Sequence, residues 1–398
     1  MSALAQALLD SGASVSGADR TLGTPVLARL SAQGVRILPN DGSGVADETT
    51  RLVVSTAIED DNPDLVAAKA RGIPVVHRAA ALAEALSPHR LVAVAGTCGK
   101  STVTAMLGHV LAECGFDPLV VNGAQVVGWD GNGKRVGSVR EAAAPRFAVA
   151  EVDESDKSLS AFHPYAAIVT NASADHYSKE EMDEVFDAFV KDVPGPVVDG
   201  RVRRDFPFSA AGRVPMPGAH NVRNAELAVA MAVELGAPLD AALKAIETFP
   251  GVERRMQRVG ECAGAIVYDD YAHNPEKLHA TITTLQEAYP RGIAVLWRPH
   301  GYGPLRKMKD ALAAMFAATL RPEDALYLLP VYDAGGTADR SVNSEALGIG
   351  EVLPDLAAAE RALREAAPRF GAIAICGARD PGLPVLARGL CDSPAPNP

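Results

Sequence analysis

Short apolar, β-branched runs alternate with amphipathic stretches rich in Ala and Leu along almost the whole chain. This alternation is typical of α/β folds, because each strand of a parallel sheet is followed by a helix that leads to the next strand. The apolar runs predict strands at 14–17, 51–55, 91–95, 147–152, 166–170, 265–269, 293–297, 325–329 and 372–376. The amphipathic stretches predict helices at 2–11, about 101–114, 178–192, 221–235 and from about 239.

Two breaks divide this pattern into blocks. Ser87-Pro88 interrupts it because a proline disfavours a helical residue before it, and Pro250-Gly251 interrupts it again. We therefore predict an α/β fold of three domains, at 1–88, 89–252 and 253–398. A chain of 398 residues is long enough for two or three such domains.

Composition narrows the classes of function. The chain has 38 Lys and Arg against 49 Asp and Glu, a net charge of −11, which is not the footprint of a general nucleic-acid binder. Five cysteines without a CxxC pair argue against a disulfide framework and a structural zinc site. No apolar run approaches the roughly 20 residues of a membrane span, and the first residues lack a basic leader. We expect a cytoplasmic protein.

The strongest chemical signal is the segment VAVAGTCGKSTVTAML at 92–107. A predicted strand enters the turn Gly96-Thr97-Cys98-Gly99-Lys100-Ser101, and a helix follows directly. Backbone N–H groups of such a turn bind phosphate oxygens, a lysine reaches the terminal phosphates, and a serine hydroxyl suits Mg²⁺. The usual motif has one more glycine, at the position of Val94, so a chance turn is the alternative.

Acidic residues follow the next long apolar run. Glu151 lies within that run, so it is the best candidate for a metal ligand at the end of a neighbouring strand. Asp153, Glu154 and Asp156 come after it, and a solvated acidic loop is the alternative for Glu154 and Asp156.

Three further polar clusters stand in apolar surroundings. The run 166–170 leads to Asn171, Asp175 and His176, at a strand end where ligands of parallel sheets bind, although a lone histidine is often structural. At a predicted helix start, Asn221 and Asn224 are one turn apart and either cap the helix or contact an adenine edge. The run 265–269 leads to Asp269, Asp270, Tyr271, His273 and Asn274, more titratable groups than a turn requires.

Taken together, these segments resemble the Mur ligases, ATP-dependent enzymes that add amino acids to the cell-wall precursor, and among them the group that adds L-alanine to UDP-N-acetylmuramate. The resemblance covers nearly the whole chain. It rests on motifs in the family's order, namely VSGADR, VVSTAIEDDNP, AVAGTCGKST, AEVDESD, IVTNASADH, PGAHNVRNA, ERRMQRVGE, YDDYAHNPEK, WRPHGYGPLR and GARDP.

The resemblance implies a Rossmann-like first domain, a P-loop ATPase-type central domain and a Rossmann-like third domain, with ATP between the last two. It implies that a substrate carboxylate attacks the γ-phosphate of ATP, and that an amine then displaces phosphate from the acyl phosphate. Small-molecule substrates and a monomer or homodimer are implied as well. The implied nucleotide contacts are Gly96, Thr97, Gly99, Lys100, Ser101, Thr102, Asn221, Asn224, Arg255 and Asp270.

Further roles are implied residue by residue. Lys100 stabilises the transferring phosphoryl group, Ser101 and Glu151 hold one Mg²⁺, and His176 helps to hold a second metal ion. The implied substrate contacts are Asp19, Ser55, Thr56, Tyr271, His273, His300 and Arg306.

The chain departs from this family in several places. Cys98 stands where the alanine-adding group has a histidine, Ser178 replaces an aspartate, and the segment between His176 and Asn221 is shortened. Gly301 and Pro304 stand where that group has arginines that bind the incoming carboxylate. His300 and Arg306 could replace these arginines in part. Otherwise we expect weak selection for L-alanine, or an amine substrate whose carboxylate is blocked or bound elsewhere in the protein.

The beginning of the sequence also departs. Relatives start with a strand and a glycine-rich turn, and this sequence begins at the Met of that turn. If the strand is missing from the given sequence, the strands near 14–17 and 51–55 should lie about 9–10 Å apart without pairing. If they pair directly, a rebuilt first domain with a substrate other than a UDP-sugar is the better interpretation.

Two alternative functions stay open on these residues. One is a Mur-like ligase outside peptidoglycan synthesis, with a different acid or amine. The other is an ATP-binding regulatory protein with little ligase activity, against which Lys100, Ser101, Glu151, His176 and Asp270 speak.

Overall fold

The computed structural model describes residues 1–19, 22–154, 158–172, 179–333 and 339–394, and it is an α/β protein as predicted. The chain forms two compact units. Unit 1 holds residues 1–215 and 222–250, and unit 2 holds residues 216–221 and 251–398. The predicted break at Pro250-Gly251 is one of these divisions. A separate domain at 1–88 is not distinguished from the rest of unit 1, so that boundary stays our proposal.

The first 88 residues of unit 1 carry short helices and strands. The helices are α1 (Ser2–Asp10), α2 (Pro25–Ala32), α3 (Pro63–Ala70) and α4 (Arg78–Leu86). Strand β1 (Ser16–Ala18) pairs in parallel with β2 (Arg36–Leu38), and β3 (Leu52–Val54) pairs in parallel with β4 (Val75–His77). Within the described residues β1 and β3 belong to separate sheets, which confirms that they do not pair with each other.

A six-stranded sheet forms the centre of unit 1. Its strands are β5 (Arg90–Ala95), β6 (Leu119–Val121), β7 (Val139–Arg140), β8 (Phe147–Glu151), β9 (Ala166–Val169) and β10 (Val197–Asp199). The order is β10-β9-β5-β8-β6-β7, parallel except for β7. Strands β5, β8 and β9 are buried over nearly their whole length, as continuous apolar runs in a sheet covered on both faces should be.

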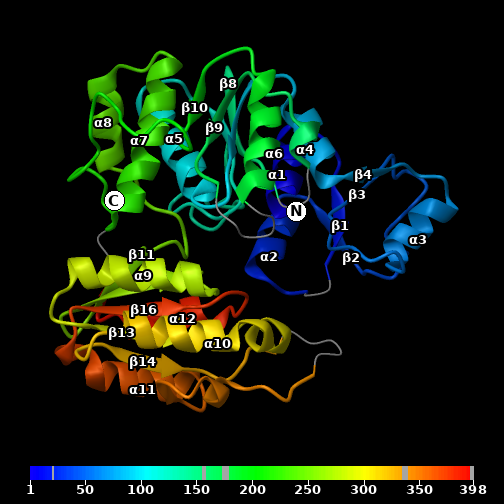
Figure 1. Ribbon diagram of the computed structural model, residues 1–398. Coiled ribbons are helices and arrows are strands. Elements are labelled where there is room, and N and C mark those ends of the chain that lie inside the picture. Colours follow the sequence, from blue (N-terminus) through cyan, green and yellow to red (C-terminus); the bar gives the residue numbers. More distant parts are fainter. Residues whose placement is uncertain (20–21, 155–157, 173–178, 334–338, 395–398) are drawn as a thin grey trace. The chain divides into compact units, whose positions relative to one another are not determined.

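Helices cover both faces of this sheet (Figure 1). On one face, α6 (Lys179–Lys191), α1 and α4 pack on the strands in one apolar core. On the other face lie α5 (Lys100–Glu113), α7 (Ala219–Glu234) and α8 (Leu239–Glu247). Ten of the 14 residues of α5 are buried, on all sides of the helix, so α5 is a central element of the unit.

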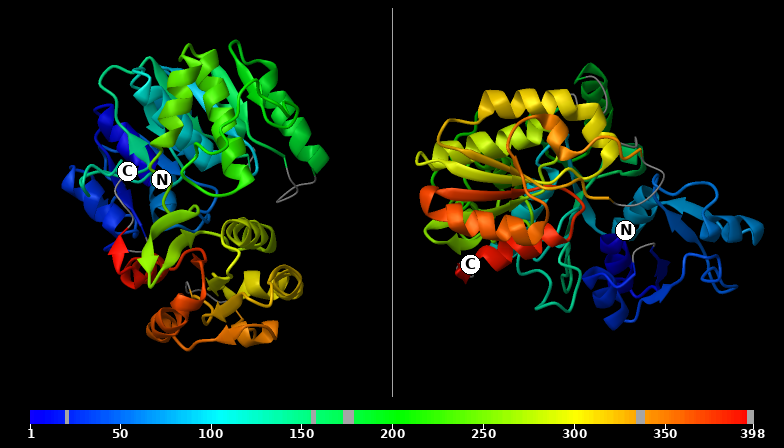
Figure 2. Two further views of the ribbon diagram at one scale, coloured as in Figure 1. Left: turned by 90° about the vertical axis from the view of Figure 1, so that its left-hand side faces the viewer. Right: turned by 90° about the horizontal axis from the view of Figure 1, so that it is seen from below.

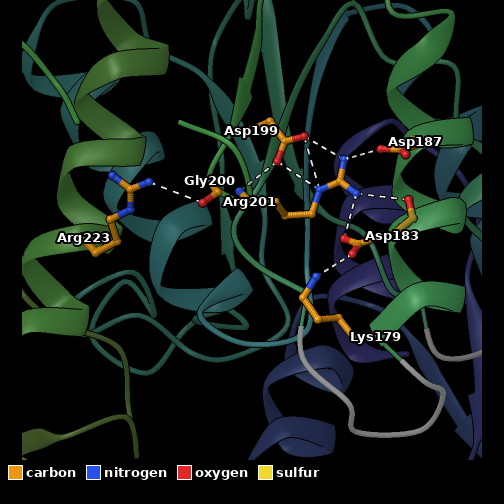
Figure 3. A network of polar contacts seen from close by, with 7 residues as sticks. All are labelled: Lys179, Asp183, Asp187, Asp199, Gly200, Arg201 and Arg223. Carbon is orange, nitrogen blue, oxygen red and sulfur yellow. Dashed lines mark hydrogen bonds and ion pairs between the residues drawn. The ribbon is translucent and has the colours of Figure 1, made fainter. Parts of the chain in front are cut away.

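One arginine ties the edge strand β10 to helix α6 (Figure 3). The Arg201 side chain is 9% exposed and donates to Asp199 (Nη2 to Oδ2, 2.7 Å), Asp187 (2.7 Å) and Asp183 (3.2 Å). On the other side of β10, Arg223 of α7 donates to the backbone oxygens of Gly200 and its neighbours. The segment after β10 is thereby fixed to two helices.

Unit 2 contains a seven-stranded sheet. Its strands are β11 (Gln257–Cys262), β12 (Ala265–Asp270), β13 (Ile293–Trp297), β14 (Ala325–Leu328), β15 (Glu351–Val352), β16 (Ala372–Cys376) and β17 (Ser393–Pro394). The order is β15-β14-β13-β16-β12-β11-β17, and the strands from β15 to β12 are parallel. The short helices η1 (Ser158–Ala161), η2 (Ser344–Leu347) and η3 (Ala367–Arg369) complete the two units.

Two apolar cores lie on opposite faces of the seven-stranded sheet. Helices α9 (Pro275–Ala288) and α10 (Tyr302–Thr319) form one core with the sheet. Helices α11 (Leu356–Ala366) and α12 (Gly382–Leu390) form the other. The right-hand view of Figure 2 shows the yellow helices on one side of the strands and the orange and red ones on the other.

Observed elements follow the predicted ones closely. The strands predicted at 293–297 and 372–376 have those bounds, and helix α7 begins two residues earlier than predicted. Helix α6 begins at Lys179, and Ser178, the first residue of the predicted helix, lies outside the described residues.

Removing the Arg201 side chain should destabilise unit 1, because three carboxylates lose a nearly buried partner. We expect Arg201→Met to lower the free energy of unfolding by about 3 kcal/mol, measured by urea denaturation. Lys179→Ala is the control, because Lys179 pairs with Asp183 on an exposed surface and should change it by less than about 0.5 kcal/mol. Equal effects of the two variants would contradict a structural role for Arg201.

Candidate active site

The glycine-rich turn joins β5 to α5 at the carboxyl end of the parallel strands. Helix α5 begins at Lys100 after the N-cap residue Gly99, which has no side chain to accept from the N–H groups of the first turn. Ser101 and Thr102 are 8% and 6% exposed. This is the geometry of a phosphate-binding helix N-terminus.

Two positions of this turn have room only for glycine, because neighbouring side chains lie too close for a Cβ. A Cβ on Gly96 would lie 2.0 Å from Thr170 Oγ1, and one on Gly99 would lie 2.7 Å from Asn224 Oδ1. Gly99 also has φ +83°, a conformation that glycine adopts without strain. The turn therefore packs directly against β9 and α7.

Lys100 is held by a carboxylate that the sequence did not single out. Its Nζ donates to Gly96 O at 2.7 Å and to both oxygens of Glu154, at 2.9 and 2.7 Å. Glu154 is 6% exposed, so the interpretation of Glu154 as a solvated loop residue is wrong. Burial raises the pKa of Glu154, and the nearby Lys100 charge opposes that shift.

Asn171 holds the turn from the neighbouring strand. Its Oδ1 accepts from Thr97 Oγ1 at 2.6 Å and from the Cys98 N–H at 3.0 Å, and its Nδ2 donates to Cys98 O at 2.9 Å. Thr170 Oγ1 donates to the same Cys98 oxygen at 2.6 Å. The sequence placed Asn171 at this strand end but gave it no role.

Glu151 ends the strand beside β5, as predicted. It stands opposite Val94 in the ladder, and its Oε2 accepts the Gly123 N–H at 2.8 Å. A carboxylate and the Ser101 hydroxyl at the ends of adjacent strands are hard oxygen ligands that fit Mg²⁺, which keeps waters and phosphate oxygens as its other ligands. The described residues contain no ready group of three His, Cys, Asp or Glu side chains for a metal ion. Asp156, Asp175 and His176 lie outside them.

A pocket of about 160 Å³ adjoins Glu151. It is lined by the start of α1, by Arg78, and by residues that follow β6 and β8, among them Asn122, Gly123 and Asp153. Asn122 is 2% exposed, and among the described residues its Oδ1 has no hydrogen-bond partner. A buried amide oxygen at a pocket wall is a site for a ligand donor.

The two asparagines of α7 are both buried. Asn221 Nδ2 donates to Pro217 O at 2.7 Å, and both asparagines lie inside α7, which begins at Ala219, so the interpretation of either one as the cap of this helix is wrong. Asn224 lies against Gly99 of the phosphate-binding turn. An adenine contact of either residue stays a prediction.

Asp269 and Asp270 end strand β12 of unit 2. Asp270 accepts the Met256 N–H at 2.6 Å and the Ala272 N–H at 2.8 Å, so it shapes the backbone around Arg255, whose charge lies near it. Burial raises the pKa of Asp270, and it raises that of Asp269 to about 6 although Arg254 stands 3.3 Å away. The ribose contact of Asp270 and the phosphate contact of Arg255 stay predictions.

The structure brings three of the proposed substrate contacts together. The rings of Tyr271 and His273 have centroids 5.6 Å apart, and those of His273 and His300 are 5.0 Å apart. Burial lowers the pKa of His300 to about 4, and His273 and Arg379 add to this effect. Arg306 is not part of the group that the ring contacts define, because it pairs with Asp339 at 2.8 Å.

The proposed nucleotide-sugar contacts follow β1 and β3. Asp19 is exposed, Ser55 is partly buried and Thr56 is exposed. They follow strands of separate two-stranded sheets, and their binding role stays a prediction.

Comparison with known proteins agrees with the motifs. Residues 1–90 match the family model "Mur ligase family, catalytic domain", and residues 254–379 match "Mur ligase, glutamate ligase domain". A UDP-N-acetylmuramate–L-alanine ligase of Solidesulfovibrio magneticus is 33% identical, over 91% of this chain and 89% of that protein. One of Burkholderia ambifaria is 34% identical, over 87% and 84%.

Solved structures share the fold. The UDP-N-acetylmuramate-alanine ligase of Thermotoga maritima superimposes with a TM-score of 0.77 at 23% identity, over 98% of this chain and 95% of that one. A folylpolyglutamate synthase/dihydrofolate synthase of Yersinia pestis, solved with AMPPNP and a Mn ion, has a TM-score of 0.55 at 15% identity, over 79% and 92%. No helix among the described residues is long and apolar enough to cross a membrane.

We expect Lys100→Ala to abolish turnover, because removing one such electrostatic donor costs about 2.7–4 kcal/mol of transition-state stabilisation. The Lys100 side chain is only 14% exposed, so the variant should also unfold more easily. It leaves Glu154 buried without its partner, at a cost of about 3 kcal/mol. Thermal unfolding and ADP release measure the two effects.

The double variant Lys100→Ala/Glu154→Gln separates them. It should recover the melting temperature of the wild type while turnover stays lost. A single Lys100→Ala variant that keeps more than about a tenth of wild-type turnover would contradict the phosphate-binding assignment.

Proposed function

The chain belongs to the Mur ligase family and is an ATP-dependent ligase, and we propose that it joins L-alanine to the carboxylate of UDP-N-acetylmuramate. The acid and the amine come from the relatives that are 33 and 34% identical over most of both chains. Support from the structure rests on one observation: Lys100 lies at an uncapped helix start, beside the carboxyl ends of β5, β8 and β9.

In the first step, a carboxylate oxygen of the acid attacks the γ-phosphorus of ATP, which forms an acyl phosphate and releases ADP. The N–H groups at the start of α5 bind phosphate oxygens, and Lys100 neutralises the charge that the transfer develops. Phosphate competes with Glu154 for the Lys100 ammonium, because both are anions that accept from the same Nζ. Asn171 and Thr170 keep the turn in place meanwhile.

We assign Ser101 and Glu151 to one divalent cation, which we propose is Mg²⁺, and His176 to a second metal ion. When bound, the ion neutralises phosphate charge and helps to align the reacting groups. Glu151 is suited to this because only Gly123 donates to it among the described residues. The backbone bond to Gly123 orients the carboxylate.

We place the acid at the pocket beside Glu151. The Arg78 guanidinium, which lines this pocket, attracts an anionic part of the substrate. Arg78 stands 3.7 Å from Asp153. The pocket itself is small, and it takes one part of the acid rather than the whole molecule.

In the second step, the amino group attacks the carbonyl carbon of the acyl phosphate and phosphate leaves. The amide bond forms as the amine loses a proton. His300 is neutral at pH 7, because its pKa is lowered to about 4, so it can accept a hydrogen bond from the amine as well as donate one.

Phosphate release tests this function. With ATP and Mg²⁺, we expect phosphate only when UDP-N-acetylmuramate and an amino acid are both present, together with a product whose mass equals the two joined less one water. L-alanine, glycine, L-serine and short peptides should be compared as amines. Phosphate release that ignores both the acid and the amine would contradict the proposal.

A further inference from the structure

The sheet of unit 2 has a point where the connections that follow its strands change from one face to the other. Strands β12 and β13 are followed by α9 and α10, which pack on one face, whereas β16 is followed by α12 on the other face. Strand β16 lies between β12 and β13. In such sheets, ligands bind outside the carboxyl end at the point where neighbouring connections diverge. The end of β16 is that point.

The segments that follow the three strands are tied together above this point. Gly377 N donates to Asp270 O at 3.1 Å, and Arg298 N donates to Cys376 O at 3.1 Å. Arg298 also bonds Asp380 at 2.6 Å. His273 comes from the β12 side and His300 from the β13 side, and their rings meet at 5.0 Å. Arg379, on the loop after β16, is near enough to His300 to lower its pKa.

Arg379 differs from the other charged residues at this edge. Arg254 pairs with Asp269, Arg298 with Asp380 and Arg306 with Asp339. Arg379 is exposed, and within the described part of the chain its guanidinium makes no hydrogen bond or ion pair. The cation beside the two imidazoles is therefore free to bind an anion.

The backbone at Arg379 is held in a conformation that suits glycine. Its φ is +65°, which is uncommon and strained for a residue with a Cβ. Strained positions of this kind concentrate at ligand-binding sites, where the surrounding structure maintains them. The two neighbours of Arg379 in sequence, Ala378 and Asp380, are buried and fix the loop.

A helix start contributes to the same place. Helix α10 begins at Tyr302, directly after His300 and Gly301, and its N-cap residue Gly301 has no side chain to cap it. Its N-terminal N–H groups carry a partial positive charge that favours an anion. The guanidinium, the imidazoles and the helix start thus come from three loops at one edge.

We propose that Arg379, together with His300 and the start of α10, binds the carboxylate of the incoming amino acid and so determines that the amine is an amino acid. The inference rests on the function proposed above, which supplies a substrate with a free carboxylate beside its amino group. A planar guanidinium matches a carboxylate through two parallel hydrogen bonds. Arg379 then supplies the cation for the carboxylate, because Gly301 and Pro304 stand where the alanine-adding group has arginines. Arg306 is already paired with Asp339.

The test is the variant Arg379→Gly, which removes the cation and gives the φ +65° position the residue that suits it. We expect the KM for L-alanine to rise about ten- to a hundredfold, as for loss of a hydrogen-bonded charge, while the KM for ATP and the melting temperature stay unchanged. L-alaninamide, which has no carboxylate charge, should have the same KM in both proteins. Arg379→Lys should fall between wild type and Arg379→Gly.

Arg361→Ala is the matched control, because Arg361 is an exposed arginine of α11 in the same unit and its loss changes the net charge equally. It should leave every constant unchanged. An unchanged KM for L-alanine in Arg379→Gly overturns the inference. If Arg379→Gly raises the KM for ATP and leaves the KM for L-alanine unchanged, the inference is also overturned, because Arg379 then binds a phosphate of ATP.

A binding measurement does not depend on turnover. Acetate serves as a minimal carboxylate, and the His300 ring is followed by NMR in protein labelled at histidine, assigned with His300→Gln. Acetate should raise the pKa of His300 in the wild type and not in Arg379→Gly. If the wild type shows this response but forms no amide, the proposed function fails and the anion site stands; if amide forms without the response, the anion site fails.

Discussion

Parallel pairing of strands is the constraint on which the chemistry of this protein depends. In each unit the chemistry-bearing residues follow strand ends, and parallel pairing puts those ends at one edge of the sheet. Lys100, Glu151 and Asn171 are far apart in the sequence, yet they follow β5, β8 and β9, which are neighbours. Tight apolar packing on both faces keeps these strands in register. A slipped strand would misplace a whole loop of functional residues.

The ion pair of Lys100 and Glu154 links stability to activity in unit 1. A nearly buried ammonium needs a partner, and Glu154 provides one while the phosphate site holds no anion. A phosphate of ATP is an anion like the Glu154 carboxylate, so it can replace Glu154 as the partner of the Lys100 ammonium. Asn171 and Thr170 hold the backbone of the turn through hydrogen bonds. The turn therefore keeps its conformation when ATP binds and when ADP leaves.

Much of the fold could be predicted from the sequence, because long apolar runs such as 293–297 and 372–376 are read directly as buried strands. Those parts of the site whose residues are neighbours in the sequence could also be predicted, as for the turn from Gly96 to Ser101. Glu154 was misjudged because its partner lies 54 positions away, so the sequence showed only an acidic loop. Arg379 was part of the motif GARDP, but only the structure shows that its backbone is in a glycine-like conformation and that its guanidinium has no partner within the described residues. Arg306 was assigned to the amine site because its partner Asp339 is not visible from spacing.

The central claim is that the acid is activated by phosphorylation of its own carboxylate. The most direct measurement uses UDP-N-acetylmuramate whose carboxylate oxygens carry a heavy isotope, with ATP, Mg²⁺ and L-alanine, followed by mass spectrometry of the released phosphate and of the amide. The account predicts that each released phosphate carries a single labelled oxygen and that the amide carbonyl retains the other. Unlabelled phosphate, with both heavy atoms still in the acid, would contradict it.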